Sequence, residues 1–190
     1  MRLPSLIAAC LAVAATPAVS QVPPNAAARI AAQHAAMARI AYMNGIWRGP
    51  AWSLTPAGRR EIIQTERIGP LLDDGVKVIE GHGYLADGTT GFNALGIISF
   101  DPGTSTYVLH SYAQGYSGDF PLRLTDTGYV WEIPAGPGAI IRYTATIADN
   151  HWREVGERIA GEAPPMQIFE MNLVRVGDTG WPAGDPVPAH

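Results

Sequence analysis

The sequence predicts an all-β protein, a closed antiparallel up-and-down β-barrel of about ten strands preceded by one α-helix. The first observation is a succession of short segments, from residue 45 onward, that are rich in β-branched and aromatic residues and bounded by Gly, Pro, Asn or Asp. The second is that no long helical segment interrupts them, so parallel crossovers are not expected. A sheet of so many strands with one buried face avoids exposed edges best by closing on itself.

Residues 1–20 have the layout of a secretory signal peptide. One positive charge, Arg2, precedes a short alanine-rich apolar run, and the small residues Ala18 and Ser20 permit cleavage near Ser20, before Gln21. The apolar run is too short to span a bilayer, so no membrane span is expected. We therefore expect the mature protein to be periplasmic or secreted.

The sequence has one cysteine, Cys10, which lies inside this predicted leader. The residues before it loosely imitate the cleavage box of a bacterial lipoprotein, but cleavage there would leave an apolar segment shorter than the usual range of roughly 7–15 residues. We favour a signal-core cysteine and keep lipidation as the alternative. In either case the mature chain has no disulfide, and its stability depends on packing and sheet hydrogen bonds.

Residues 21–43 form the predicted helical region. Asn25 is the expected N-cap of a helix over Ala26–Met43, and His34 is expected to face solvent. Apolar side chains recur near helical spacing at Ile30, Met37, Ile40 and Ala41. One modest apolar stripe suits a helix that lies across a barrel mouth, and an exposed leader packed against nothing is the alternative.

Residues 44–176 form the predicted barrel, and residues 177–190 an irregular tail rich in Gly and Pro. The first strand begins with Gly45-Ile46-Trp47, and Gly49 follows two residues later. Because glycines allow close approach of a neighbour, we expect Trp47 to be the plug that closes one end of the barrel. The later strands are predicted at Arg59–Ile68, Val76–Leu85, Thr90–Phe100, Thr106–Gln114, Phe120–Leu124, Tyr129–Pro134, Ala139–Ala148, His151–Ile159 and Met166–Val176.

The motif Gly45-x-Trp47, together with the order of strands and turns as far as Val176, resembles a bacterial lipocalin-like, calycin-type domain of unknown function. The extended motif Gly45-x-Trp47-x-Gly49 is similar, more distantly, to nitrobindin-type ten-stranded barrels. That second resemblance implies a haem ligand histidine near the end of the barrel. The last predicted strand, Met166–Val176, has no histidine, so we expect no haem and assign no cofactor.

Length and composition indicate one domain. The chain has 190 residues, of which 47% are hydrophobic and 16% charged, enough for one ordinary core. The formal net charge of −4 becomes one unit more negative when Arg2 leaves with the signal peptide, which gives no footprint for nucleic acid or anionic lipid. The sequence has no Gly-x-Ser-x-Gly elbow, phosphate loop or metal-ligand histidine cluster, so we assign no catalytic residue and no metal.

Polar residues on the predicted strands are the candidates for a ligand site, because alternate residues of each barrel strand point inward. The assigned ligand-binding residues are Glu66, Glu80, His82, Asn93, His110, Tyr112 and Arg142. Three further residues, Gln64, Tyr84 and Glu154, could join this set if the strand faces that carry them point inward. The predicted partner is a small hydrophobic or amphipathic molecule, and no oligomeric state is assigned.

Two alternatives to a binding protein stay open. In an enzyme, His82 or His110 is a general base oriented by Glu80 or Glu66, and the histidine faces a water-accessible cavity. In a structural or interaction protein, the barrel is filled by its own side chains and contains no cavity.

Overall fold

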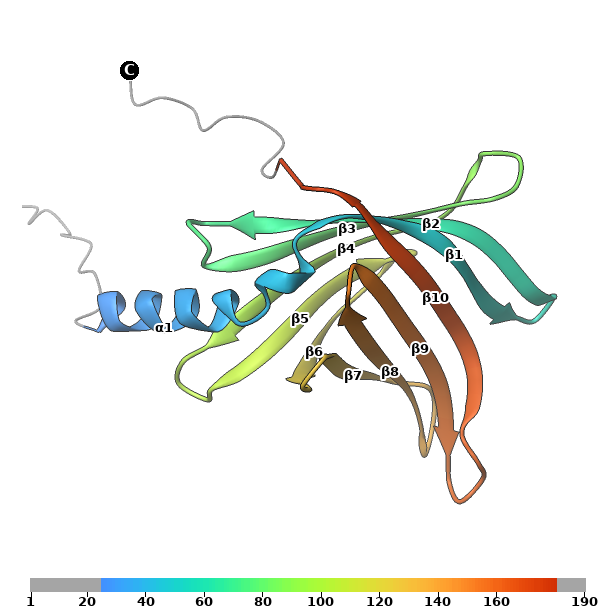
Figure 1. Cartoon of the computed structure of the whole chain (residues 1–190). Coiled ribbons are helices and arrows are strands. Elements are labelled where there is room, and N and C mark those ends of the chain that lie inside the picture. Colours follow the sequence, from blue (N-terminus) through green and yellow to red (C-terminus); the bar gives the residue numbers. More distant parts are fainter. Residues whose placement is uncertain (1–24, 181–190) are drawn as a thin grey trace, which may run out of the picture.

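The computed structural model describes residues 25–180 of the chain. Within them, one helix is followed by ten strands that form a closed antiparallel barrel (Figure 1). This architecture confirms the predicted fold class. The predicted signal peptide with Cys10, residues 21–24 and the tail beyond residue 180 lie outside the described residues. The elements are α1 (Ala26–Ala38), the 3-10 helix η1 (Ala41–Met43), β1 (Gly45–Thr55), β2 (Gly58–Leu71), β3 (Val76–Tyr84), β4 (Thr90–Asp101), β5 (Thr106–Ala113), β6 (Tyr116–Leu124), β7 (Gly128–Pro134), β8 (Ala139–Ala148), β9 (His151–Ala160) and β10 (Met166–Gly177).

The barrel closes where β1 pairs with β10. Each strand pairs with its neighbours in the sequence, and β1 and β10 join in a register that sets Ala51 opposite Met171. At Gly49, a Cβ atom would lie 2.0 Å from the carbonyl oxygen of Asn172 on β10. Only glycine therefore lets the two backbones approach this closely, which is the role expected for it from the sequence.

The hairpin between β5 and β6 is tighter than the sequence predicted. The strand β6 begins at Tyr116, four residues before the predicted Phe120, and Tyr116 pairs with Ala113. Gln114 and Gly115 between them both have positive φ angles, of 52° and 82°. A two-residue turn with two positive φ angles matches the twist of paired strands, so pairing begins directly after the turn.

The helix α1 packs on one end of the barrel with its C-terminal turns. It ends at Ala38, not at Met43 as predicted, and η1 carries the chain into β1. The backbone carbonyl of Ala36 accepts a 2.8 Å hydrogen bond from the Tyr107 hydroxyl on β5. The N-terminal part is more exposed, with Ile30 of the predicted stripe 49% exposed, and Arg29 pairs with Asp101 at the end of β4. Asn25 occupies the N-cap position without a side-chain capping hydrogen bond.

The core fills the half of the barrel next to α1, here called the closed end. Ile40 and Met43 have no exposed surface, and Trp47 is 1% exposed. The indole N–H of Trp47 donates to the carbonyl oxygen of Met43 at 2.9 Å, and its ring meets the edge of Trp152 with centroids 5.8 Å apart. The helical segment, β1 and β9 thus meet at Trp47, which closes this end of the barrel.

One charged side chain is buried at the closed end. Lys77 on β3 is 2% exposed, and its ammonium group donates to the side-chain oxygen of Asn44, the residue between η1 and β1. Burial lowers the pKa of Lys77 to about 8, and the Asp74 carboxylate opposes this change. The contact ties the helical segment to β3.

Replacement of Trp47 by alanine is expected to lower the free energy of unfolding by about 3–5 kcal/mol, because it empties the best-packed part of the core. Trp52→Ala is the matched control on the same strand, since that ring is only half-buried and packs under the Arg59 guanidinium 4.3 Å from its centroid. Urea unfolding of both variants measures the difference. Equal losses in the two variants would contradict the closing role of Trp47.

Candidate functional site

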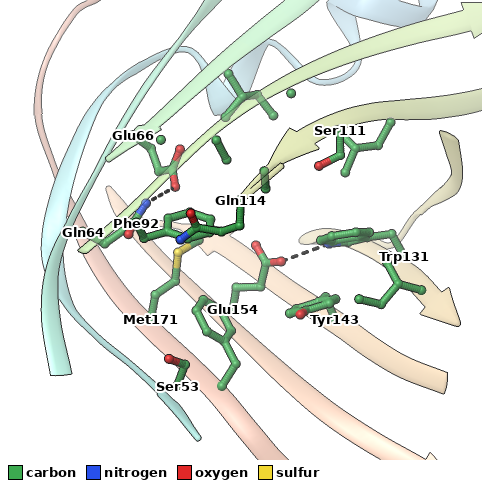
Figure 2. A pocket seen from close by; sticks show the side chains of 18 of the residues that line it. Ser53, Gln64, Glu66, Phe92, Ser111, Gln114, Trp131, Tyr143, Glu154 and Met171 are labelled. Atoms are coloured by element: carbon green, nitrogen blue, oxygen red, sulfur yellow. Dashed lines mark hydrogen bonds between the residues drawn. The ribbon is translucent and has the colours of Figure 1, made fainter. Parts of the chain in front are cut away.

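The half of the barrel opposite α1 contains a cavity of about 600 Å³. Its rim includes Leu54, Arg60, Gln114 and Tyr116, which lie beside the hairpin turns at that end. Tyr116 is 83% exposed, so the cavity communicates with solvent there. Figure 2 shows side chains from several strands converging on this space.

One wall of the cavity consists of small residues. Gly81 on β3, Ala94 and Gly96 on β4, and Ser111 and Ala113 on β5 all line it. They alternate along their strands, as the pleat of a sheet requires for residues on one face. Short side chains on three adjacent strands leave the space that the cavity occupies.

The opposite wall is aromatic. The rings of Trp131 on β7 and Tyr143 on β8 stack with centroids 4.4 Å apart, and Phe169 on β10 meets Tyr143 edge-on at 5.8 Å. All three side chains line the cavity, and all three are only half-buried although they belong to the inner face. Their faces and edges therefore border open space and are available to a bound molecule.

Glu154 on β9 projects into the cavity beside the stacked rings of Trp131 and Tyr143 (Figure 2). It is 5% exposed, and its two oxygens accept hydrogen bonds from the Tyr129 hydroxyl at 2.8 Å and the Trp131 indole N–H at 3.0 Å. Burial raises the pKa of the Glu154 carboxyl, and these donors oppose the rise because they stabilise the ionised form. The phenol of Tyr129 has a pKa well above its usual value, chiefly because it is buried.

Glu66 on β2 enters the cavity from the facing wall. It is 8% exposed, and its single hydrogen bond among residues 25–180 comes from the Gln64 amide to Oε1 at 2.8 Å. Burial raises the pKa of Glu66 to about 8; the Gln64 amide opposes this rise and the Glu154 carboxylate adds to it. A Cβ atom on Gly81 would lie 2.9 Å from Oε2 of Glu66, so the glycine makes room for this carboxyl group.

The indole N–H of Trp152 is a further polar group at the cavity floor. It helps to lower the pKa of Glu154, but it forms no hydrogen bond of ordinary geometry within the described part of the chain. An unpaired buried donor costs free energy, and the attraction between this N–H and the Glu154 carboxylate offsets part of that cost.

Of the seven assigned ligand residues, only Glu66 lines the interior cavity. The strand pleat turns the other six outward, because Ile79 and Gly81 take the inner positions of β3 and Leu109 and Ser111 those of β5. The sequence does not fix this parity, since polar and apolar residues share both faces of these strands. The residues that face outward are Glu80, His82, Asn93, His110, Tyr112 and Arg142.

Four of these six meet in a groove on the outer face of β3, β4 and β5. The groove is lined by Glu80, His82, Asn93 and Tyr112. His82 Nε2 lies 3.4 Å from Glu80 Oε1, and Glu80 also pairs with the Arg67 guanidinium. Arg67 and His82 both lower the pKa of Glu80. The structure thus brings a histidine and a carboxylate together, as the enzyme alternative requires, but in an open surface groove.

His110 lies in a separate hydrogen-bonded row on the outer face. Its Nε2 is 2.9 Å from the Ser99 hydroxyl, and its Nδ1 is 2.7 Å from an Asp119 carboxylate oxygen. A hydroxyl, an imidazole and a carboxylate in this order also occur in enzymes in which a base activates a serine. However, the three residues line neither cavity nor groove, and the strands that carry them pair with each other throughout. The row therefore cross-links three neighbouring strands, β4, β5 and β6.

Arg142 also has a structural partner. Its guanidinium donates to Glu132 on the neighbouring strand at 2.7 Å. Among the residues that the structure describes, no group of three His, Cys, Asp or Glu side chains is placed to hold a metal ion. No helix in the same part of the chain is both long and apolar enough to cross a bilayer.

The sequence left the aromatic wall and Glu154 out of the assigned site. The signal for Glu154 is present, because Trp152-x-Glu154 on β9 and Tyr129-x-Trp131 on β7 place aromatic and acidic residues on the same face. A carboxylate that shares a strand face with bulky apolar side chains is typically buried and paired with a hydrogen-bond donor or a charge. No comparable sequence pattern marks the three aromatic wall residues, Trp131, Tyr143 and Phe169, because aromatic residues are common on both faces of strands.

No family model matches the chain, and no curated protein matches it. Among solved structures, the crystal structure of Rv2717c from M. tuberculosis is similar, with a TM-score of 0.56 and 13% sequence identity over 74% of this chain and 97% of that one. A likeness at this identity shows a shared fold and no more. The function must therefore be argued from the site.

The raised pKa of Glu66 makes the free energy of unfolding depend on pH. The folded protein keeps this proton up to about pH 8, whereas the unfolded chain loses it near 4.5. Between these values the unfolded state binds fewer protons, so the free energy of unfolding falls as pH rises through this window. The raised pKa of Glu154 changes the free energy of unfolding in the same direction. Lys77 has a pKa of about 8 in the folded protein and 10.5 in the unfolded chain, so its titration affects stability only at higher pH.

Urea unfolding at a series of pH values between 4.5 and 8 tests this dependence. Glu66→Gln is expected to flatten the decline, because an amide does not titrate. The control is Glu61→Gln, which removes an exposed carboxylate from the same strand and keeps the wild-type slope. An unchanged slope in Glu66→Gln would contradict the buried, protonated state of Glu66.

Proposed function

We propose that this protein binds a small apolar or amphipathic molecule inside the barrel. The observation that carries the proposal is the cavity of about 600 Å³ with two buried carboxyl groups at its floor. Ligand pockets usually occupy about 300–1,000 Å³, have mostly apolar walls and contain a few convergent polar groups. The aromatic wall, Glu66 and Glu154 match that description.

The half-buried aromatic rings favour a binding protein over a filled barrel. In a filled barrel, inward rings pack against side chains from the facing strands and are fully buried. Trp47 and Trp152 at the closed end are buried in this way, at 1% and 2% exposure. Trp131 and Tyr143 are not, because the small residues opposite them leave a gap.

The wider proposal places this protein among lipocalin-like carriers outside the cytoplasm. The leader-like layout of residues 1–20 supports a periplasmic or secreted location. The ten-stranded closed barrel with one open mouth supports the lipocalin-like part. A carrier needs no catalytic group, and the buried carboxyl groups then serve to orient the ligand.

Titration with the neutral fluorescent probe N-phenyl-1-naphthylamine tests binding inside the barrel. We expect saturable enhancement of probe fluorescence with quenching of tryptophan emission, because Trp131 lines the cavity. Ala94→Phe, which fills the cavity, is expected to weaken binding by at least about tenfold, or 1.4 kcal/mol.

The control for this titration is Asn93→Phe, one residue earlier on β4 and on the exposed outer face. It should bind the probe like the wild type. If Asn93→Phe abolishes binding and Ala94→Phe does not, the probe occupies the outer groove and the interior binding proposal is wrong. Absence of saturable binding in the wild type would also contradict it.

A further inference from the structure

The two carboxyl groups at the cavity floor have no cationic partner. The single basic side chain that lines the described cavity is Arg60, which lies at the rim and donates to the Gly91 carbonyl at 2.9 Å. The other titratable groups that line it are Tyr116 at the rim and the phenols of Tyr129 and Tyr143. All three are neutral at physiological pH, so the interior holds two carboxyl groups with no basic side chain beside them.

We infer that the cavity binds an amphipathic amine as its ammonium ion, with the charged nitrogen between Glu66 and Glu154 and the apolar body along the aromatic wall. This inference rests on the proposed function and names the class of ligand. It assigns Glu66 and Glu154 as the groups that recognise the ligand's charge.

The hydrogen-bonding capacity of the floor matches an ammonium group. Oε2 of Glu66 has no donor among residues 25–180, although the side chain is more than nine-tenths buried and enters the cavity. Each oxygen of Glu154 already accepts one hydrogen bond, and each retains a second lone pair. An ammonium group has three donors and no acceptor, so it supplies what both carboxylates lack.

Other ligand heads fit this floor less well. A carboxylate or phosphate supplies acceptors and no donor, and its negative charge opposes the ionisation of either carboxyl group. A neutral alcohol supplies one donor, which can reach only one of the two carboxyl groups. The stacked rings of Trp131 and Tyr143, whose centroids are 4.4 Å apart, border the space for the apolar body of the ligand.

Proton exchange follows from this arrangement. In the empty cavity, burial keeps a proton on Glu66, whose pKa is about 8. A bound ammonium ion stabilises the ionised carboxylate, so the O–H bond of Glu66 breaks and its proton passes to solvent. The ammonium group keeps its three protons, and binding below pH 8 therefore releases protons from the protein.

Isothermal titration calorimetry with three probes that share one indole body tests the inference. Tryptamine carries an ammonium group, tryptophol a hydroxyl and indole-3-acetate a carboxylate. At about pH 6.5, between the pKa of Glu66 in the unfolded and folded states, tryptamine is expected to bind at least about tenfold more tightly than tryptophol. The binding enthalpy of tryptamine should differ between buffers of different ionisation enthalpy. It should become more exothermic as the ionisation enthalpy of the buffer rises, because the buffer takes up the released proton.

Glu66→Gln and Glu154→Gln separate recognition from folding. Each is expected to reduce the preference of the protein for tryptamine over tryptophol, and Glu66→Gln should also abolish most of the proton release. Tryptophol binding serves as an internal check that the variant cavity is intact. Glu61→Gln, on the opposite face of the same strand, should leave both readouts unchanged.

The outcomes distinguish this inference from the proposed function. If tryptophol or indole-3-acetate binds as tightly as tryptamine, or if none of the three binds while N-phenyl-1-naphthylamine does, the amine inference is wrong and the binding function stands. If all four probes fail to bind, both are wrong. An unchanged tryptamine preference in both glutamine variants would overturn the assigned role of the two carboxylates.

Discussion

The pairing of β1 with β10 is the interaction on which the rest of the structure depends. It converts a ten-stranded meander into a closed barrel, and it requires Gly49, because the backbone of Asn172 occupies the space a Cβ atom would take. Away from the three residue pairs between β6 and β7, the rest of the wall is formed by long strand pairings. The helical segment and Trp47 fill one end, so the cavity and its access both lie at the other.

Closure also determines the electrostatics of the interior. Glu66 and Glu154 are carried by strands on different walls, and both are removed from bulk water by the same barrel. Desolvation favours their protonated forms, while the amide, phenol and indole donors around them favour the ionised forms. These opposing effects leave Glu66 able to change its protonation state near physiological pH when a charged group enters. A protein built only for stability would gain little from such a pair, since apolar residues of similar volume pack without that cost.

The fold could be predicted from the sequence more fully than the site. Strand alternation and turn residues located all ten strands, and the burial of Trp47 follows from the motif that contains it. The site depends on strand parity, and a one-residue difference exchanges the faces of a strand. On β3 and β5 the inward set is glycine, serine and aliphatic residues, while His82 and His110 point outward. The inward face of each strand is left open by the sequence, and on β3 and β5 the structure turns the histidines outward. The helix was expected to continue to Met43, whereas the chain bends after Ala38 so that Ile40 and Met43 can enter the core.

Native mass spectrometry of the protein purified without denaturation, followed by denaturing extraction, tests the central claim most directly. If the cavity is a ligand site with a carboxylate floor, a small molecule with an apolar body and a basic nitrogen should co-purify with the wild type. Glu66→Gln and the cavity-filling Ala94→Phe should carry less of it. A wild-type protein that retains an acidic lipid would contradict the role assigned to Glu66 and Glu154. One that is free of small molecules and also fails to bind any of the four probes would contradict the ligand site itself.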